Sequence, residues 1–173
     1  RSAAIYVGNR ISYIKLWRDS LRFAAALCKL GIKRGDHVGL ILPNTPHFIV
    51  AYNGTLMAGN IVVPLNPLNS VQEIERELSD SGCNVLVVLD RLLEKLPKKR
   101  PQNLIVAEAA AYAPKHLHLL SRIKHRSKNP ANALRFEELI KSDPLKELAP
   151  VNPKEDVACI LYTTGTTGTP KGV

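Results

Sequence analysis

The 173-residue sequence has few cysteines, few aromatic residues and no long apolar run. Its three cysteines are far apart and stand among apolar neighbours: Cys28, Cys83 and Cys159. This spacing excludes a disulfide framework and a paired-cysteine metal site, and we expect three buried thiols. No apolar run approaches the roughly 20 residues that cross a bilayer. The sequence therefore predicts a soluble, cytoplasmic protein.

Positive charge is in excess. The formal net charge is +9, and 45% hydrophobic with 23% charged residues is a globular composition. Nearly all of this net charge lies between residues 91 and 128, where ten basic and two acidic residues give a net +8 of the chain's +9. Within that region, residues 115–128 interleave leucines with basic side chains, a pattern suited to peripheral contact with an anionic membrane. A solvated surface insertion is the alternative. We expect no nucleic-acid partner, because only Tyr112 is available in this region to stack on bases.

The N-terminal pattern predicts a hairpin followed by a helix. Residues 3–7 and 10–14 alternate around Gly8-Asn9, a sequence that favours a two-residue β-turn. Apolar residues then recur at helical spacing over residues 16–30. Gly31 stands where a left-handed residue commonly ends a helix.

The next segment predicts strand, helix and strand. Short apolar runs at 38–42 and 61–65 are typical of buried strands, and residues 48–58 between them suit a helix. Pro64 indicates a sheet edge or strand end, because proline has no backbone N–H to donate. His47 is predicted to lie in a loop.

A parallel sheet with helices on both faces accounts for the remaining pattern. Ser70 to Glu73 form a capping box that predicts a helix start. Apolar runs at 85–89 and 104–107 predict two more strands, and a short helix is expected at 136–141. Residues 157–162 are apolar throughout and predict a central strand. Alternating strands and helices build parallel sheets, so we expect an α/β fold.

The segment from Tyr162 to Val173 reads YTTGTTGTPKGV and carries the chemistry. Its glycines let successive backbone amides turn toward one point, which creates a concavity for anionic oxygen. Five threonine hydroxyls add donors, and Lys171 adds a compact positive charge suited to a polyphosphate. It is not a Walker A loop, because Pro170 precedes the lysine and Gly172 follows it.

This segment resembles the phosphate-binding loop of the adenylate-forming enzymes, the superfamily of acyl-CoA synthetases, firefly luciferase and peptide-synthetase adenylation domains. The family form has serine where this chain has Thr164, so a hydroxyl is retained. Residues 58–67, which read AGNIVVPLNP, resemble another block of the family. Residues 10–13 and 31–48 are also similar to its N-terminal lobe.

The resemblance implies a site and a reaction. A fatty carboxylate would attack the α-phosphate of ATP, and the thiol of coenzyme A would then displace AMP. Lys171, as a charge clamp, and Thr163 would act in catalysis, and Thr166 would contact Mg²⁺. The residues implied in holding ATP phosphates and pyrophosphate are Thr163, Thr164, Gly165, Thr166, Thr167, Gly168, Thr169 and Lys171.

The resemblance also implies a domain organisation: an α/β lobe at 1–90, a basic loop-rich insertion at 91–150, and a strand with the phosphate loop at 151–173. The chain is expected to be a piece of a longer protein, inactive as a ligase on its own. The basic stretch with Tyr112-Ala113-Pro114 resembles long-chain fatty acyl-CoA ligases.

Three alternatives stay open at the level of the sequence. Instead of a fatty acyl-CoA ligase, the sequence is also compatible with an aryl-CoA ligase, an amino-acid ligase, or a non-catalytic relative that binds a membrane or partner. The oligomeric state is also open, with a homodimer as one alternative. Peripheral attachment to a membrane is the alternative to a purely cytoplasmic location.

Overall fold

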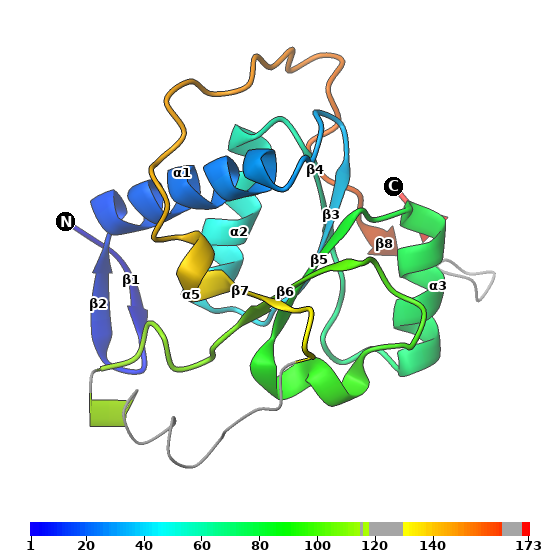
Figure 1. Cartoon of the computed structure of the whole chain (residues 1–173), viewed down its shortest axis with the longest axis horizontal. Coiled ribbons are helices and arrows are strands. Elements are labelled where there is room, and N and C mark those ends of the chain that lie inside the picture. Colours follow the sequence, from blue (N-terminus) through cyan, green and yellow to red (C-terminus); the bar gives the residue numbers. More distant parts are fainter. Residues whose placement is uncertain (115, 118–129, 164–170) are drawn as a thin grey trace.

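One parallel sheet organises the fold. The computed structural model describes residues 1–114, 116–117, 130–163 and 171–173. Five strands lie in the order β4-β3-β5-β6-β7, and each neighbouring pair is parallel (Figure 1). The strands are β3 His37–Ile41, β4 Ile61–Pro64, β5 Val85–Leu89, β6 Asn103–Ala107 and β7 Leu134–Arg135. The predicted α/β fold class is confirmed.

Helices cover both faces of this sheet, as predicted (Figure 1). Val85 and Val87 of β5 pack in the same cluster as α1 and α2, whereas Leu86 and Val88 pack toward α3. Because successive side chains of a strand point to opposite faces, a strand covered on both sides is apolar throughout. The helices are α1 Tyr13–Lys29, α2 Pro46–Met57 and α3 Val71–Ser81.

The N-terminal hairpin is confirmed, with its turn one residue earlier than expected. Strands β1 Ser2–Tyr6 and β2 Asn9–Ser12 are antiparallel, and Tyr6 pairs with Asn9. The turn is therefore Val7-Gly8, where both residues have positive φ, 50° and 81°. Both central residues of a type I′ turn need positive φ, and Gly8 adopts it without steric cost.

The ends of the helices follow local chemistry. The side chain of Ser12 accepts a hydrogen bond from the Lys15 amide at the start of α1. Helix α2 begins at Pro46 rather than at Phe48. Proline is tolerated in the first turn, because the N–H that it lacks would have no partner within the helix there. The Ser70–Glu73 capping box of α3 is confirmed, with both of its reciprocal bonds present.

Two short helical elements complete the covering of the sheet. The 3₁₀ helix η1 spans Asp90–Lys95 after β5, and α5 spans Phe136–Leu139 after β7. Phe136 is fully buried, and its ring stacks on Phe23 of α1 with centroids 5.1 Å apart. The short helix predicted at 136–141 is thus present and packs against α1.

The prediction of a central strand at 157–162 is wrong. Residues in this segment make one parallel bridge, between Cys159 and Val62 on the outer side of β4. Pairing cannot continue along β4, because Pro64 has no N–H to offer the next carbonyl. Val157 and Leu161 are 54% and 53% exposed. The segment instead leads into a small hairpin of β8 Tyr162–Thr163 and β9 Lys171–Gly172.

The three cysteines are free thiols, but the prediction that all are buried is wrong. Cys28 is exposed, one residue before the end of α1 at Lys29. Cys83 and Cys159 are partly buried, and burial raises the pKa of both thiols. A raised pKa keeps a thiol protonated and unreactive near neutral pH.

Candidate nucleotide-binding site

Two of the predicted site residues face each other across the β8–β9 hairpin. Thr163 pairs with Lys171, and Tyr162 pairs with Gly172. Leu161 and Val173, which flank the Tyr162–Gly172 pair, exchange two backbone hydrogen bonds of 2.9 Å. Side chains directly opposite in an antiparallel pair have Cβ atoms about 5 Å apart. The hairpin therefore brings a hydroxyl and an ammonium group together where the connecting segment 164–170 begins and ends.

The other predicted contacts lie outside the described residues. They are Thr164, Gly165, Thr166, Thr167, Gly168 and Thr169. The predicted Mg²⁺ contact at Thr166 is among them. Across the part of the chain that the structure describes, no group of three or more His, Cys, Asp or Glu side chains is arranged to hold a metal ion.

The hairpin lies beyond the carboxyl end of β4. The Val62 amide donates to the Ala158 carbonyl at 3.0 Å, and the Ile160 amide donates to the Val62 carbonyl at 2.9 Å. This pairing is parallel, so the chain runs in the same direction as β4 and reaches Tyr162 past the strand's end. Open α/β sheets bind ligands at the carboxyl ends of their strands. Thr163 and Lys171 are both exposed at this edge, where they can donate to an anionic ligand.

Tyr162 joins the hairpin to α3. Its hydroxyl donates to Oδ2 of Asp80 at 2.6 Å and lies 3.2 Å from the Glu77 carbonyl oxygen. Burial and then the bond to Asp80 raise the pKa of Tyr162 above its usual range. The phenol therefore stays protonated and remains a donor at assay pH.

A second polar cluster was missed by the sequence reasoning. The Tyr112 hydroxyl donates to Oδ2 of Asp19 at 2.7 Å inside the protein, and Lys15 forms an ion pair with the same oxygen at 2.8 Å. Burial, followed by the charge of Asp19, raises the pKa of Tyr112. Asp19 and Tyr112 are 93 positions apart, so no motif spacing could have paired them.

His47 belongs to the same region, and its predicted place in a loop is wrong. It lies in the first turn of α2 and is fully buried. Its ring contacts Tyr112 edge-on at 4.8 Å and Phe136 at 5.4 Å between centroids. Among the described residues, neither ring nitrogen has a hydrogen-bond partner, although Nε2 lies 3.8 Å from Oε1 of Glu137. These groups connect α1, α2 and α5 and are remote in sequence from the hairpin.

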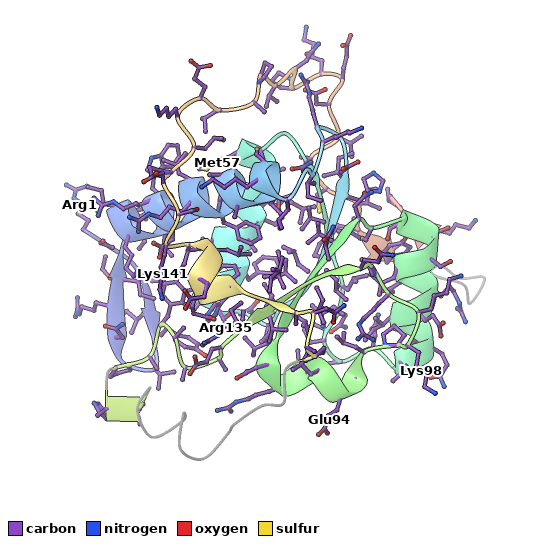
Figure 2. The ribbon with its side chains drawn as sticks, viewed as in Figure 1. Arg1, Met57, Glu94, Lys98, Arg135 and Lys141 are labelled. Carbon is purple, nitrogen blue, oxygen red and sulfur yellow. The ribbon has the colours of Figure 1, made fainter. Side chains whose placement is uncertain are left out.

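The basic segment is described only in part. Arg91, Lys95, Lys98 and Lys99 are exposed, and Figure 2 shows Glu94 and Lys98 at the periphery of the molecule. Residue 115 and residues 118–128 of the predicted membrane contact lie outside the described residues, so that contact stays a prediction. None of the helices in the described ranges has the length and apolar character needed to span a bilayer.

Comparison with solved structures identifies the class of fold. A benzoate CoA ligase from Burkholderia xenovorans LB400 has a TM-score of 0.77 at 24% identity, over 99% of this chain and 30% of its own. The long-chain-fatty-acid-CoA ligase FadD1 from Archaeoglobus fulgidus has a TM-score of 0.73 at 27% identity, over 95% of this chain and 29% of its own. The fold is therefore the one that these CoA ligases share over this part of their length.

The family follows from the sequence comparison. The model of the AMP-binding enzyme family matches residues 1–173, so the chain belongs to this family. A long-chain-fatty-acid–CoA ligase of Bacillus subtilis (strain 168) is 31% identical over the whole chain. The chain spans about a third of that relative's length, 33%. The resemblance to adenylate-forming enzymes drawn from residues 162–173 is confirmed.

Proposed function

We propose that the protein containing this chain is an ATP-dependent acyl-CoA ligase that activates a fatty carboxylate. A carboxylate oxygen attacks the α-phosphorus of ATP, the bond to the bridging oxygen breaks, and pyrophosphate leaves. The thiol of coenzyme A then attacks the acyl carbon and releases AMP. Support comes from membership of the AMP-binding family and from the likeness to long-chain-fatty-acid–CoA ligases of two organisms.

The observation that carries the proposal is the pairing of Thr163 with Lys171 beyond the carboxyl end of β4. A hydroxyl and an ammonium side by side can both donate to phosphate oxygens, which fits the polyphosphate of ATP. In this proposal the intervening residues 164–169 add amide and hydroxyl donors. Mg²⁺, when bound, would neutralise phosphate charge, with Thr166 as a contact.

Lys171 acts electrostatically in this proposal. Negative charge moves onto the leaving pyrophosphate as the bond to the α-phosphorus breaks. A fixed ammonium group stabilises that charge without taking or giving a proton. Thr163 orients the same phosphates through its hydroxyl. The two residues therefore position the nucleotide and stabilise the leaving group.

The test is fatty-acid-dependent exchange of labelled pyrophosphate into ATP, measured with the full-length protein. We expect Lys171→Ala to lower kcat by about a hundred- to a thousandfold, the usual effect of losing one donor to a charged transition state. Lys141→Ala is the matched control, because Lys141 is also an exposed lysine but pairs with Glu138 at 2.8 Å. Unchanged exchange in Lys171→Ala would contradict the assigned role.

The substrate class is tested with the same assay. We expect palmitate to support faster exchange than benzoate or any amino acid. Faster exchange with benzoate would identify an aryl-CoA ligase instead, and no exchange with any carboxylate would refute the proposed activity. We also expect residues 1–173 alone to form no acyl-CoA, because one wall of a binding site does not hold the substrates.

The division into residues 1–90, 91–150 and 151–173 is part of the proposal. Limited proteolysis of the full-length protein tests it. We expect the first cleavage within 91–150 but outside η1, β6, β7 and α5, because connections between elements are cleaved before packed elements. First cleavage within α1 or α2 would contradict the division.

A further inference from the structure

The phenol of Tyr162 stands at the base of the hairpin that carries Thr163 and Lys171. It immediately precedes Thr163 in β8, and its pairing partner Gly172 immediately follows Lys171 in β9. Any force on the Tyr162 side chain is therefore transmitted to both strands beside the candidate site.

The hydroxyl of Tyr162 contacts a helix that is itself firmly held. Helix α3 buries Ile74 and Leu78 against the sheet and begins with a complete capping box. The Tyr162 hydroxyl donates to Asp80 in the last turn of this helix at 2.6 Å. A hydrogen bond to a carboxylate is shorter and stronger than one between neutral groups.

The ring of Tyr162 contacts the opposite strand. A Cβ atom added to Gly172 would lie 3.4 Å from Cζ of Tyr162 and 3.0 Å from Cγ2 of Ile160. The absence of a side chain at Gly172 thus lets the phenol ring lie close against β9. The same ring packs with Ile160 against the apolar cluster beneath α3.

Two sets of contacts around the hairpin have different effects. The reciprocal bonds between Leu161 and Val173 join the two strands to each other. The bond from Tyr162 to Asp80 joins the pair of strands to α3. The first set fixes the shape of the hairpin, and the second fixes its place relative to the sheet.

We infer that Tyr162, acting through Asp80, is a positioning residue for the nucleotide phosphates. It holds Thr163 and Lys171 at a fixed place beyond the end of β4, so that ATP meets a preorganised pair of donors. This inference rests on the proposed function of the hairpin as a phosphate site. Preorganised donors need no reorganisation when charge develops, so their loss weakens nucleotide binding.

The experiment is steady-state kinetics of the full-length ligase with Tyr162→Phe, which removes the hydroxyl and keeps the ring. Because Asp80 is exposed, water competes for it, and we expect the KM for ATP to rise by roughly three- to tenfold. The KM values for the fatty acid and for coenzyme A should not change. Asp80→Ala should reproduce the effect, Asp80→Asn should restore part of it, and the double variant should be no worse than either single one.

Ser70→Ala is the matched control, because it breaks the capping box of α3 without touching Tyr162. We expect it to lower the melting temperature but leave the KM for ATP unchanged. An equal rise in KM in this variant would show that general weakening of α3 is responsible, and would overturn the inference. An unchanged KM in Tyr162→Phe would overturn it as well.

A separate readout distinguishes failure of the inference from failure of the proposed function. Hydrogen exchange of the Leu161 and Val173 amides can be followed by NMR in the same protein without nucleotide. We expect roughly tenfold faster exchange of both amides in Tyr162→Phe, and no change in the Val38 amide of the sheet. If the wild type catalyses no pyrophosphate exchange, the proposed function fails and this measurement decides whether Tyr162 anchors the hairpin. Unchanged exchange of the two amides would show that it does not.

Discussion

Burial of His47 predicts a loss of stability in mild acid. The side chain is fully buried between Tyr112 and Phe136, and burial lowers its pKa from 6.5 to about 4. The positive end of α2 adds to this effect, because His47 lies in the helix's first turn. The Glu137 carboxylate 3.8 Å away opposes it, and burial raises the pKa of that carboxyl.

The sign and size follow from proton linkage. The unfolded chain binds a proton at His47 near pH 6.5, whereas the folded chain binds it only near pH 4. Between these values the unfolded state carries more protons, so the free energy of unfolding falls as the pH is lowered. The full difference is about 3 kcal/mol at 1.36 kcal/mol per pKa unit, and roughly 2 kcal/mol of it is lost between pH 6.5 and pH 5.

The assay is urea denaturation followed by circular dichroism at pH 7.5 and pH 5. In His47→Leu the side chain cannot titrate, so we expect the fall in unfolding free energy between these pH values to be smaller by about 2 kcal/mol than in the wild type. His116→Gln is the control, because His116 is exposed. Equal pH dependence in His47→Leu and the wild type would refute the reasoning.

Three further substitutions test the packing. Gly54→Ala would place a methyl group 2.7 Å from the Ser20 carbonyl oxygen of α1, and we expect urea denaturation to show a net loss of about 1–2 kcal/mol despite the better helix propensity of alanine; equal stability would contradict the close crossing of α1 and α2. Phe136→Ala removes the ring stacked on Phe23 and should cost about 3–5 kcal/mol in the same assay, whereas a loss below about 1 kcal/mol would contradict its burial. Ser70→Ala should cost about 1 kcal/mol by thermal melting, and an unchanged melting temperature would show that the cap contributes nothing.

Local chemistry made much of the fold predictable. The capping box at Ser70, the end of α1 at Gly31 and the apolar strands of the sheet each depend on neighbouring residues in the sequence. The strand expected at 157–162 failed for a different reason. Its apolar pattern was suitable, but pairing also needs an N–H on the neighbouring strand, and Pro64 offers none. The sequence pattern of one segment does not identify its partner.

The site was predictable only where one continuous motif carried it. Thr163 and Lys171 are eight positions apart in that motif, and the hairpin pairs them. The contacts that hold the hairpin come from elsewhere, since Tyr162 bonds to Asp80 across 82 positions. The burial of His47 likewise depends on rings contributed by later segments. Such contacts have no signature in spacing or composition.

Pro64 has one more consequence, for encounters between molecules. An edge strand with free backbone groups can recruit a strand from another copy of the protein and so begin aggregation. Here the Cys159 bridge occupies the outer side of β4 at Val62, and Pro64 removes the donor where pairing would otherwise extend. The proline at position 64 thus protects the edge strand β4 against β-pairing with another molecule. Replacing Pro64 with valine would restore that donor on the outer side of β4.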